Sequence, residues 1–395
     1  MPDTMRGAAA IVGIGELKPE RERPDRDTVS LLTEACYLAI QDAGLTKSDI
    51  DGLIMEPEIQ QTASGFNAVM AEHMGSFPTW ATGCDVQGAA GVVMAVQAAA
   101  YVNAGLADFV LCGTATAMDP RAPRPEHSRR TETWSSEFTS PFGPVVAANG
   151  WYAMIARRHE MLYGTTVEKR AKISVDQRYN ANHNPWAVFY DSPLTVQDVV
   201  NSRIVADPLH LLECVMPVSG ACAFVVTRAG LARGMRNKPA YVLGGAHSIQ
   251  RNNLAHVGEI SISPVGQASR KAFRMSGYGP KDMQVLEIYD SYTITVICEM
   301  EESGFCKKGE GGDWIQEQDF TIKGNLPLNT HGGQMSYGQA ALAGGCSHVS
   351  EAVRQIRRTA DEHQVAGPTD LVFVTGSGGL FSQQSAMVLA SEAAL

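Results

Sequence analysis

This 395-residue chain lacks the features that mark several common classes of protein. Its eight cysteines form no CxxC pair and no zinc-like Cys/His spacing, which argues against a metal site and against a secreted disulfide framework. No window holds 18 uninterrupted apolar residues, and the N-terminus does not resemble a signal peptide. Acidic residues outnumber basic ones by 42 to 32, without a long basic cluster. We predict a cytoplasmic protein with no metal and with neither a nucleic-acid nor a membrane partner.

Phosphate-binding motifs are also missing. There is no Walker sequence, and GIGELKPE has neither the third glycine nor the context of a dinucleotide fingerprint. The residues alone therefore give no indication of how a phosphate group would be bound.

What is present is an alternation of strands and helices that occurs twice. Residues 8–15 form an apolar run that ends in glycine, and residues 28–43 have apolar positions at helical spacing. Residues 88–104 predict a helix that is apolar on nearly every face, and residues 107–115 predict the strand after it. The pairing returns as a helix over 343–357 and a strand over 369–379. Two such units, each with its own sheet, predict an α/β protein of two similar halves in five α/β/α/β/α layers, with the repeated helices at the centre.

A long insertion separates parts of this repeat. Residues 118–208 are Pro-rich and charged at first and then helical from Trp151 to Tyr163, which is too much chain for a passive loop. We expect an N-terminal half of 1–117 and 209–250, an inserted domain of 118–208 that covers the site, and a C-terminal half of 251–395.

Eight stretches in fixed order resemble one superfamily over nearly the whole chain. They are IVGIGE, GLADFVLCG, WYAMIARRHEMLYGTT, VNSRIVADPL, EIYDSYT with ESGFCKKGEGG, LPLNTHGG, SYGQAALAGG and VTGSGG. The chain is similar to the thiolase superfamily, in its branch of lipid-transfer-protein-like thiolases related to the sterol carrier thiolases. This resemblance implies the thiolase fold and coenzyme A as part of the substrate, with no covalently bound cofactor.

The residues that a thiolase uses for chemistry are replaced. The nucleophilic cysteine of the family, at the start of the first central helix, corresponds here to Gly88, which has no nucleophile. The family's histidine corresponds to Gln339, and its second cysteine corresponds to Val374. The chain thus resembles the cysteine-less thiolase-fold aldolases of steroid side-chain degradation, which use tyrosines.

Tyr289, in EIYDSYT, lies where thiolases place a residue that positions catalytic water. A phenol there can stabilise an oxyanion or transfer a proton, although it is equally well a core aromatic at the end of a strand. The second aldolase tyrosine would correspond to Gln339, so Tyr337 or His331 would have to help. The resemblance assigns thioester binding to the backbone of Gly88, Ala89 and Gly378.

Several residues keep two interpretations. Cys84 becomes a nucleophile if the helix start shifts by four residues, and is otherwise a structural cysteine. Asp290 orients Tyr289 or, as we expect, caps the helix that follows it. His348 is expected to be a core histidine with satisfied hydrogen bonds. The positively charged side chains expected to be solvated, with phosphate contact as the alternative, are Arg157, Arg158 and Arg170.

Three functions follow. The first is a lyase that makes or breaks a C–C bond in a β-hydroxyacyl-CoA by an aldol or retro-aldol reaction. The second is a thiolase or acyltransferase that uses Cys84, and the third is a non-catalytic subunit that binds lipid or acyl-CoA. The resemblance also implies a homodimer and a separate OB-fold subunit with a zinc ribbon, which would complete a heterotetramer.

Overall fold

The computed structural model describes residues 5–57, 65–118, 147–250, 256–340 and 343–395. Their main feature is a sheet of nine strands in the order β3-β2-β4-β7-β1-β8-β11-β10-β9. The strands are β1 Ala9–Glu16, β2 Gly52–Met55, β3 Trp80–Gly83, β4 Phe109–Thr116, β7 Gly220–Arg228, β8 Ala240–Ile249, β9 Val285–Glu287, β10 Leu371–Gly378 and β11 Gln383–Ala390.

The two halves meet where β1 pairs with β8. Only two residue pairs join these strands, Ala10 with Tyr241 and Ile11 with Ala240. The expectation of a separate sheet in each half therefore needs correction, because this short ladder links the two sheets into one hydrogen-bonded array. Neighbouring strands elsewhere pair over up to eight positions, as β10 and β11 do.

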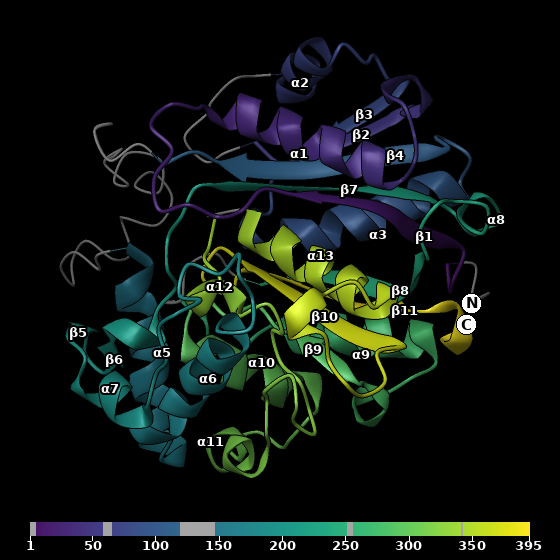
Figure 1. The fold of residues 1–395 in the computed structure, drawn as a ribbon. Helices are drawn as coiled ribbons and strands as arrows, with labels where there is room; N and C mark the ends of the chain where they lie inside the picture. Colours follow the sequence, from purple (N-terminus) through teal and green to yellow (C-terminus); the bar gives the residue numbers. More distant parts are fainter. Residues whose placement is uncertain (1–4, 58–64, 119–146, 251–255, 341–342) are drawn as a thin grey trace.

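Helices complete five layers around these strands (Figure 1). Helices α1 and α2 cover the outer face of the N-terminal strands, α3 and α13 lie between the two groups of strands, and α9 and α10 cover the other outer face. Their bounds are α1 Thr28–Asp42, α2 Phe66–Met74, α3 Ala90–Asn103, α9 Val265–Ser276, α10 Thr293–Ser303 and α13 Gly344–Arg357. The predicted layered α/β architecture is confirmed.

Helix α1 shows how local sequence sets these elements. Asp27 caps its N-terminus, and the Asp27 carboxylate accepts a hydrogen bond from the Ser30 N–H at 2.7 Å. Leu31, Leu32 and Ala35 lie on one helical face and are buried against the strands. The cap determines where the helix begins, and the apolar face determines which side of it packs on the sheet.

The central helices approach each other closely near their N-termini. A Cβ atom on Gly91 of α3 would lie 2.4 Å from the carbonyl oxygen of Gly345 in α13, and a Cβ atom on Gly345 would lie 2.2 Å from the carbonyl oxygen of Gly88. Only glycine fits at such a backbone contact. A 3-10 turn, Gln87–Ala89, precedes α3, so the predicted helix start near Gly88 is displaced by about two residues.

The inserted segment contributes helices beside α10. Its described elements are α5 Ala147–Tyr163, α6 Val167–Ala181, α7 Val196–Asn201, β5 Ile204–Ala206 and β6 Leu209–His210. The Pro-rich and charged beginning of this segment, from residue 119 to residue 146, lies outside the described residues. Residues 118–208 as a domain remain a prediction.

Arg170 of α6 corrects one expectation. Its side chain is fully buried, and its Nε atom lies 2.7 Å from the Glu213 carboxylate. It is therefore a structural ion pair and not a solvated charge. The side chains of Arg157 and Arg158 are 41% and 44% exposed, and they form ion pairs with Asp207 and Glu259.

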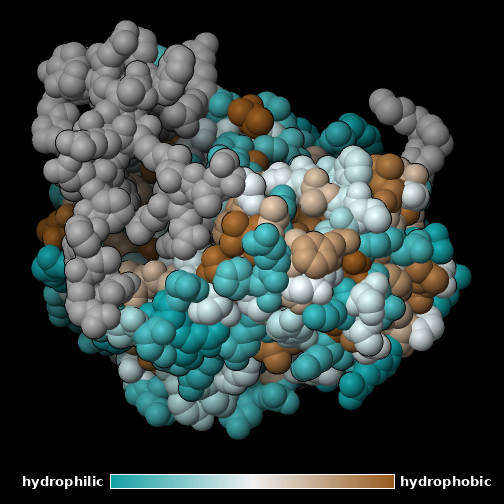
Figure 2. Space-filling model, turned by 90° about the horizontal axis from the view of Figure 1, so that it is seen from above, coloured by the Kyte–Doolittle hydropathy of each residue, from teal (hydrophilic) through white to brown (hydrophobic). Residues whose placement is uncertain are grey.

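The surface of the molecule is mixed in polarity. On the face shown in Figure 2, apolar side chains are interspersed with hydrophilic ones. No helix among the described residues is both long and apolar enough to span a membrane.

The fold also contains short helices, which are α8 Ala229–Ala232, α11 Gly311–Trp314 and α12 Gly333–Ser336.

Candidate active site

The candidate site lies where strand β9 ends beside the start of α3. Tyr289 follows β9 by two residues, and its side chain is 5 % exposed. A Cβ atom added to Gly88 would lie 2.2 Å from the Tyr289 hydroxyl and 2.3 Å from the Ser377 carbonyl oxygen. The phenol thus occupies the space that a side chain at position 88 would need, so Gly88 and Tyr289 fit together as a pair.

Gln339 completes this pair. Its Nε2 atom donates a hydrogen bond to the Tyr289 hydroxyl oxygen at 3.0 Å. Burial raises the pKa of Tyr289 well above its usual range, and the nearby phenol of Tyr152 adds to this effect, while the bond from Gln339 opposes it. Tyr289 is therefore a neutral phenol at ordinary pH. Because the Tyr289 oxygen accepts a hydrogen bond from Gln339, the Tyr289 O–H can donate a hydrogen bond to another group.

A strained turn surrounds Gly88. Gln87, Leu380 and Phe381 all have positive φ, at 54°, 56° and 64°, a conformation that costs energy in residues other than glycine. The Gln87 side chain accepts a hydrogen bond from the Gly379 N–H at 3.0 Å. The strain is thus held at the contact between the start of α3 and the end of β10.

Glu56 stabilises the same turn through hydrogen bonds to its backbone. Its buried carboxylate accepts a hydrogen bond from the Gln87 N–H at 2.8 Å and another from the Val86 N–H. Burial raises the pKa of Glu56 to about 8. The turn before α3 is therefore fixed by a group whose charge changes near neutral pH.

The predicted thioester-binding backbone is only partly available. The Ala89 N–H already donates to the Val86 carbonyl at 3.3 Å, so Ala89 is not a free donor. A Cβ atom on Gly378 would lie 2.2 Å from the same Val86 carbonyl, so Gly378 is required there for packing. Thioester binding by Gly88 stays a prediction.

Cys84 has an environment opposite to that of a catalytic thiol. It lies between β3 and the turn at Gln87, and its side chain is 3 % exposed. Burial raises the pKa of its thiol well above the usual range, and the nearby Glu56 carboxylate raises it further. A nucleophilic cysteine needs the reverse, a positive environment that favours the thiolate.

A buried charged network lies behind Tyr289. His348 of α13 places its Nδ1 atom 3.0 Å from the Glu287 carboxylate and its Nε2 atom 3.1 Å from Asp290. These two partners outweigh burial and raise the pKa of His348 to about 9. We therefore assign His348 as an imidazolium between two carboxylates, in line with the expectation of a core histidine with satisfied hydrogen bonds.

The expectation that Asp290 caps the following helix, α10, is wrong. The residue that precedes α10 is Tyr292, and α10 has no side-chain cap. The Asp290 carboxylate instead accepts hydrogen bonds from the backbone N–H groups of Gln334 and Met335, at 3.0 and 3.2 Å. Asp290 therefore fixes the segment that leads to Gln339.

His331 and Tyr337 are buried residues that contact the charged network and each other. His331 is 1 % exposed, with its Nδ1 atom 3.4 Å from Glu287 and its ring 4.9 Å from that of Tyr337. The buried hydroxyl of Tyr337 faces Glu16 and Arg354. The structure thus brings Gln339 to the Tyr289 hydroxyl, whereas His331 lies beside Glu287 and Tyr337.

Sequence reasoning missed two residues beside Tyr289. Tyr152, on α5, stacks on Tyr292 with ring centroids 4.5 Å apart, and its phenol contributes to the raised pKa of Tyr289. Glu299, on α10, is fully buried and accepts a hydrogen bond from Thr375 at 2.5 Å, and burial raises its pKa to about 8. The only signals in the sequence were a polar residue inside an apolar helix and an aromatic residue in the inserted segment.

One group among the described residues has spacing suited to a metal. The ligand atoms of Glu287, His331 and His348 all lie within 4.8 Å of one another, and all three side chains are buried. A protonated His348 that bridges two carboxylates has no free lone pair for a metal ion. The group fits an ion-pair network better than a metal centre.

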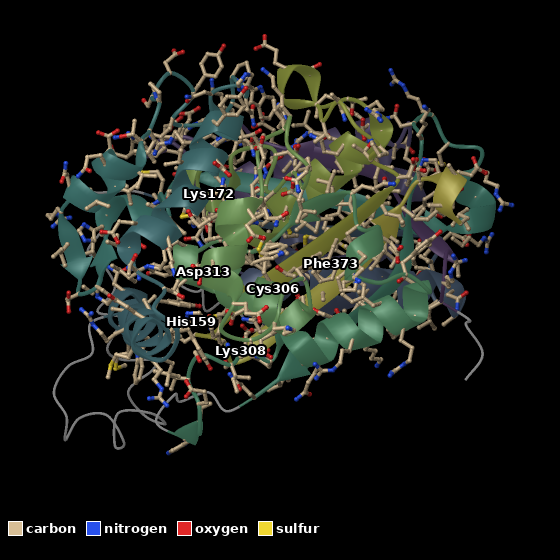
Figure 3. All side chains as sticks on the ribbon, turned by 90° about the horizontal axis from the view of Figure 1, so that it is seen from below. His159, Lys172, Cys306, Lys308, Asp313 and Phe373 are labelled. Atoms are coloured by element: carbon tan, nitrogen blue, oxygen red, sulfur yellow. The ribbon has the colours of Figure 1, made fainter. Side chains whose placement is uncertain are left out.

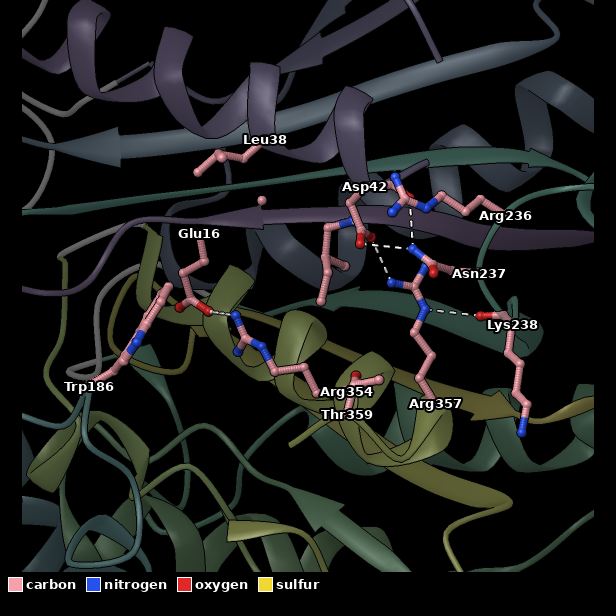
Figure 4. A pocket seen from close by; sticks show the side chains of 12 residues that line it. Glu16, Leu38, Asp42, Trp186, Arg236, Asn237, Lys238, Arg354, Arg357 and Thr359 are labelled. Carbon is pink, nitrogen blue, oxygen red and sulfur yellow. Dashed lines mark hydrogen bonds and ion pairs between the residues drawn. The ribbon is translucent and has the colours of Figure 1, made fainter. Parts of the chain in front are cut away.

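A surface hollow of about 560 Å³ lies between the C-terminal ends of α1 and α13 (Figure 4). Two ion pairs cross it, Arg354 with Glu16 and Arg357 with Asp42, each with its closest atoms less than 3 Å apart. Its lining includes Trp186 but no residue that we predicted for the site. The hollow is therefore separate from Tyr289.

Comparison with known proteins identifies the family of this chain. A family model described as "Thiolase C-terminal domain-like" matches residues 246–391. A "steroid side-chain-cleaving aldolase" of Thermomonospora curvata is 33% identical over 94% of this chain and 96% of its own length. A "17-hydroxy-3-oxo-4-pregnene-20-carboxyl-CoA lyase" of Mycobacterium tuberculosis is 34% identical over 95% and 97%. An "acetyl-CoA acetyltransferase" of Methanothermobacter thermautotrophicus is 32% identical over 91% and 93%.

Solved structures agree on the fold. The structure of an "Ltp2-ChsH2(DUF35) aldolase" superposes with a TM-score of 0.87 at 32% identity, over 98% of this chain and 99% of that one. Human mitochondrial 3-ketoacyl-CoA thiolase superposes with a TM-score of 0.70 at 16% identity, over 98% and 100%. The second likeness concerns the fold alone.

Proposed function

This chain belongs to the thiolase superfamily, in the branch that includes steroid side-chain-cleaving aldolases, and we propose that it cleaves a β-hydroxyacyl-CoA by a retro-aldol reaction. The observation that carries the proposal is the space at Gly88, where the Tyr289 hydroxyl replaces any side chain. A phenol in the place of a nucleophile suits a reaction without a covalent intermediate.

The chemistry follows from the geometry of the pair. In a retro-aldol step the β-hydroxyl loses its proton, the Cα–Cβ bond breaks, and its electron pair forms an enolate on the thioester. Tyr289 is a neutral donor, held by Gln339, and stabilises the oxygen that becomes negative. Reprotonation of Cα then gives an acyl-CoA and a carbonyl product, so no external oxidant or reductant is needed.

The substrate and partners extend this proposal. The lyase of M. tuberculosis is named for a steroid thioester with a hydroxyl β to the carbonyl, which is the pattern this reaction requires. The aldolase structure that superposes with a TM-score of 0.87 is named together with a second component, a DUF35 protein, and we propose a separate subunit of that kind here. We also propose a homodimer, a cytoplasmic location, and an inserted segment 118–208 that covers the site.

The test is the Tyr289→Phe variant, assayed with and without a DUF35-type subunit on 17-hydroxy-3-oxo-4-pregnene-20-carboxyl-CoA. Loss of one oxyanion donor lowers kcat by about 10²- to 10³-fold. Tyr37→Phe is the matched control, because the Tyr37 hydroxyl bonds the Met74 carbonyl in the outer helical layer. Unchanged turnover in Tyr289→Phe would overturn the assignment, and tight binding without turnover in the wild type would favour a non-catalytic subunit.

A further inference from the structure

The main chain at Tyr289 is held by two side chains from other parts of the sequence. The Tyr289 N–H donates a hydrogen bond to the Thr375 hydroxyl oxygen, on β10, at 2.9 Å. Asn329 accepts from the Ile288 N–H and donates to the Ile288 carbonyl, each at 2.8 Å. The phenol is therefore placed beside Gly88 by side chains that bind its main chain.

Glu299 of α10 orients the Thr375 hydroxyl. This hydroxyl donates to the Glu299 Oε2 atom at 2.5 Å while it accepts from the Tyr289 N–H. Because a hydroxyl has a single hydrogen, its bond to Glu299 leaves the lone pairs free to accept from Tyr289. The Glu299 side chain is fully buried, and its Oε1 atom has no hydrogen-bond partner among the described residues. Glu299 is thus joined to the Tyr289 main chain through one intervening hydroxyl.

Glu301, two residues further along α10, is a buried glutamate with different surroundings. The two glutamates lie on different faces of the helix, because neighbours on one face are three or four residues apart. His159 of α5 and Lys308 each approach the Glu301 carboxylate to 3.1 Å (Figure 3). Burial alone would raise the pKa of Glu301, but these partners lower it below its ordinary value. Glu301 therefore binds α5 as a charged group, whereas Glu299 binds only a neutral hydroxyl among the described residues.

We propose that Glu299 is a positioning residue for Tyr289 and acts on it through the Thr375 hydroxyl, an inference that rests on the proposed function. The bond keeps the hydroxyl oriented toward the Tyr289 N–H, so the phenol holds its place while the thioester oxygen becomes negative. In this role Glu299 touches neither the substrate nor the reacting atoms. Displacement of a catalytic group by about 1 Å can lower a rate by about 10²-fold, so loss of this support lowers kcat.

The charge of Glu299 has a second consequence. Burial raises its pKa to about 8, while the bond from Thr375 and the charge of His348 oppose that rise and Asp290 adds to it. Its other ionisable neighbours are Tyr152, Tyr289 and Cys298. Above a pH of about 8 a buried negative charge lies near the Tyr289 phenol and opposes the negative charge that develops in the reaction. Turnover is therefore expected to fall as pH rises through about 8.

The experiment measures kcat and KM of Glu299→Leu and Thr375→Val in the full protein, assayed with a DUF35-type subunit on the same steroid thioester. Both variants lower kcat by up to about 10²-fold, because the phenol loses its support, and KM changes little. Thr375→Ser keeps the hydroxyl between Glu299 and the Tyr289 N–H, so it restores kcat.

Glu299→Gln separates positioning from packing and serves even if Glu299→Leu folds poorly. Its amide oxygen still accepts from the Thr375 hydroxyl, so kcat near pH 7 stays close to that of the wild type. Because an amide does not ionise, kcat falls less above a pH of about 8 than it does in the wild type. Glu302→Gln is the control, since Glu302 lies on the same helix and pairs with Lys308, and it keeps the wild-type pH profile.

The outcomes are distinguishable. Wild-type protein without turnover overturns the proposed function and this inference together. Loss of activity in Tyr289→Phe with a wild-type kcat in Glu299→Leu overturns only the inference. A Glu299→Gln variant whose pH profile equals that of the wild type also overturns it, because Glu299 then contributes to packing alone.

Discussion

The two central helices occupy equivalent places in the two halves but carry opposite kinds of residue. The buried positions of α3 hold only Ala, Gly, Val and Met. Those of α13 include His348, Glu351 and Gln355 in addition to small residues. The N-terminal half thus supplies Gly88 and the Glu56 carboxylate that holds the turn before α3, while the C-terminal half supplies Tyr289 and the charged network behind it. Under the proposed function, the chemistry depends on residues that surround the turn before α3 and not on a side chain of that helix.

The largest expected difference between the two helices is in stability. His348→Leu leaves Glu287 and Asp290 buried without their cation, which costs about 3–5 kcal/mol of unfolding free energy. Met94→Leu, a buried and nearly isosteric change on α3, costs less than about 1.5 kcal/mol. Urea unfolding of both variants measures the difference, and equal losses would contradict the comparison.

The same network predicts a pH dependence. The folded pKa of His348, about 9, lies above its ordinary value of 6.5. The stability it contributes is therefore present below pH 6.5 and is lost as pH rises through 9, by about 3 kcal/mol at about 1.4 kcal/mol per pKa unit. The raised pKa values of Glu56 and Glu299 act in the same direction between about pH 4.5 and 8. Thermal unfolding from pH 6 to 9 tests this, and in His348→Leu the slope should be smaller.

The close contact at Gly88, in the turn before α3, is tested by the Gly88→Ala variant. The added methyl group collides with the Tyr289 hydroxyl and the Ser377 carbonyl, so we expect a loss of about 1–3 kcal/mol and of activity. Gly230→Ala on α8 is the control, since nothing lies within 4 Å of its added Cβ atom. Equal stability and activity in both variants would show that the space at Gly88 is not filled by the phenol.

The smallest expected effect concerns Gln339→Leu. It removes one hydrogen bond to the Tyr289 oxygen, which contributes about 0.5–1.5 kcal/mol and therefore lowers kcat by about 2- to 13-fold. Gln267→Leu, at an exposed position of α9, is the matched control. A kcat for Gln339→Leu equal to that of the control would remove Gln339 from the site.

The sequence predicted the layers well, because long apolar periodicities determine which faces of helices and strands are buried. It also predicted that Gly88 and Tyr289 would matter, through the resemblance to thiolases. It did not predict that they touch, because a contact between residues about 200 positions apart depends on how the two halves pack.

The ionisable network was harder to foresee. Glu287 lies in the apolar run that forms β9, and nothing in its local sequence indicates a bond to His348 on another element. The prediction of a solvated Arg170 was wrong because a single helix cannot show that Glu213 would pair with it in the interior. Tyr152 was missed because its contact with Tyr292 depends on how α5 packs beside α10.

The most direct test of a reaction without a cysteine nucleophile is to measure kcat for Cys84→Ala and Tyr289→Phe side by side on the same β-hydroxyacyl-CoA. The buried, protonated thiol of Cys84 predicts that Cys84→Ala keeps a kcat close to that of the wild type. Tyr289→Phe is expected to lose about 10²- to 10³-fold. The reverse result, with activity lost in Cys84→Ala and kept in Tyr289→Phe, would contradict the account.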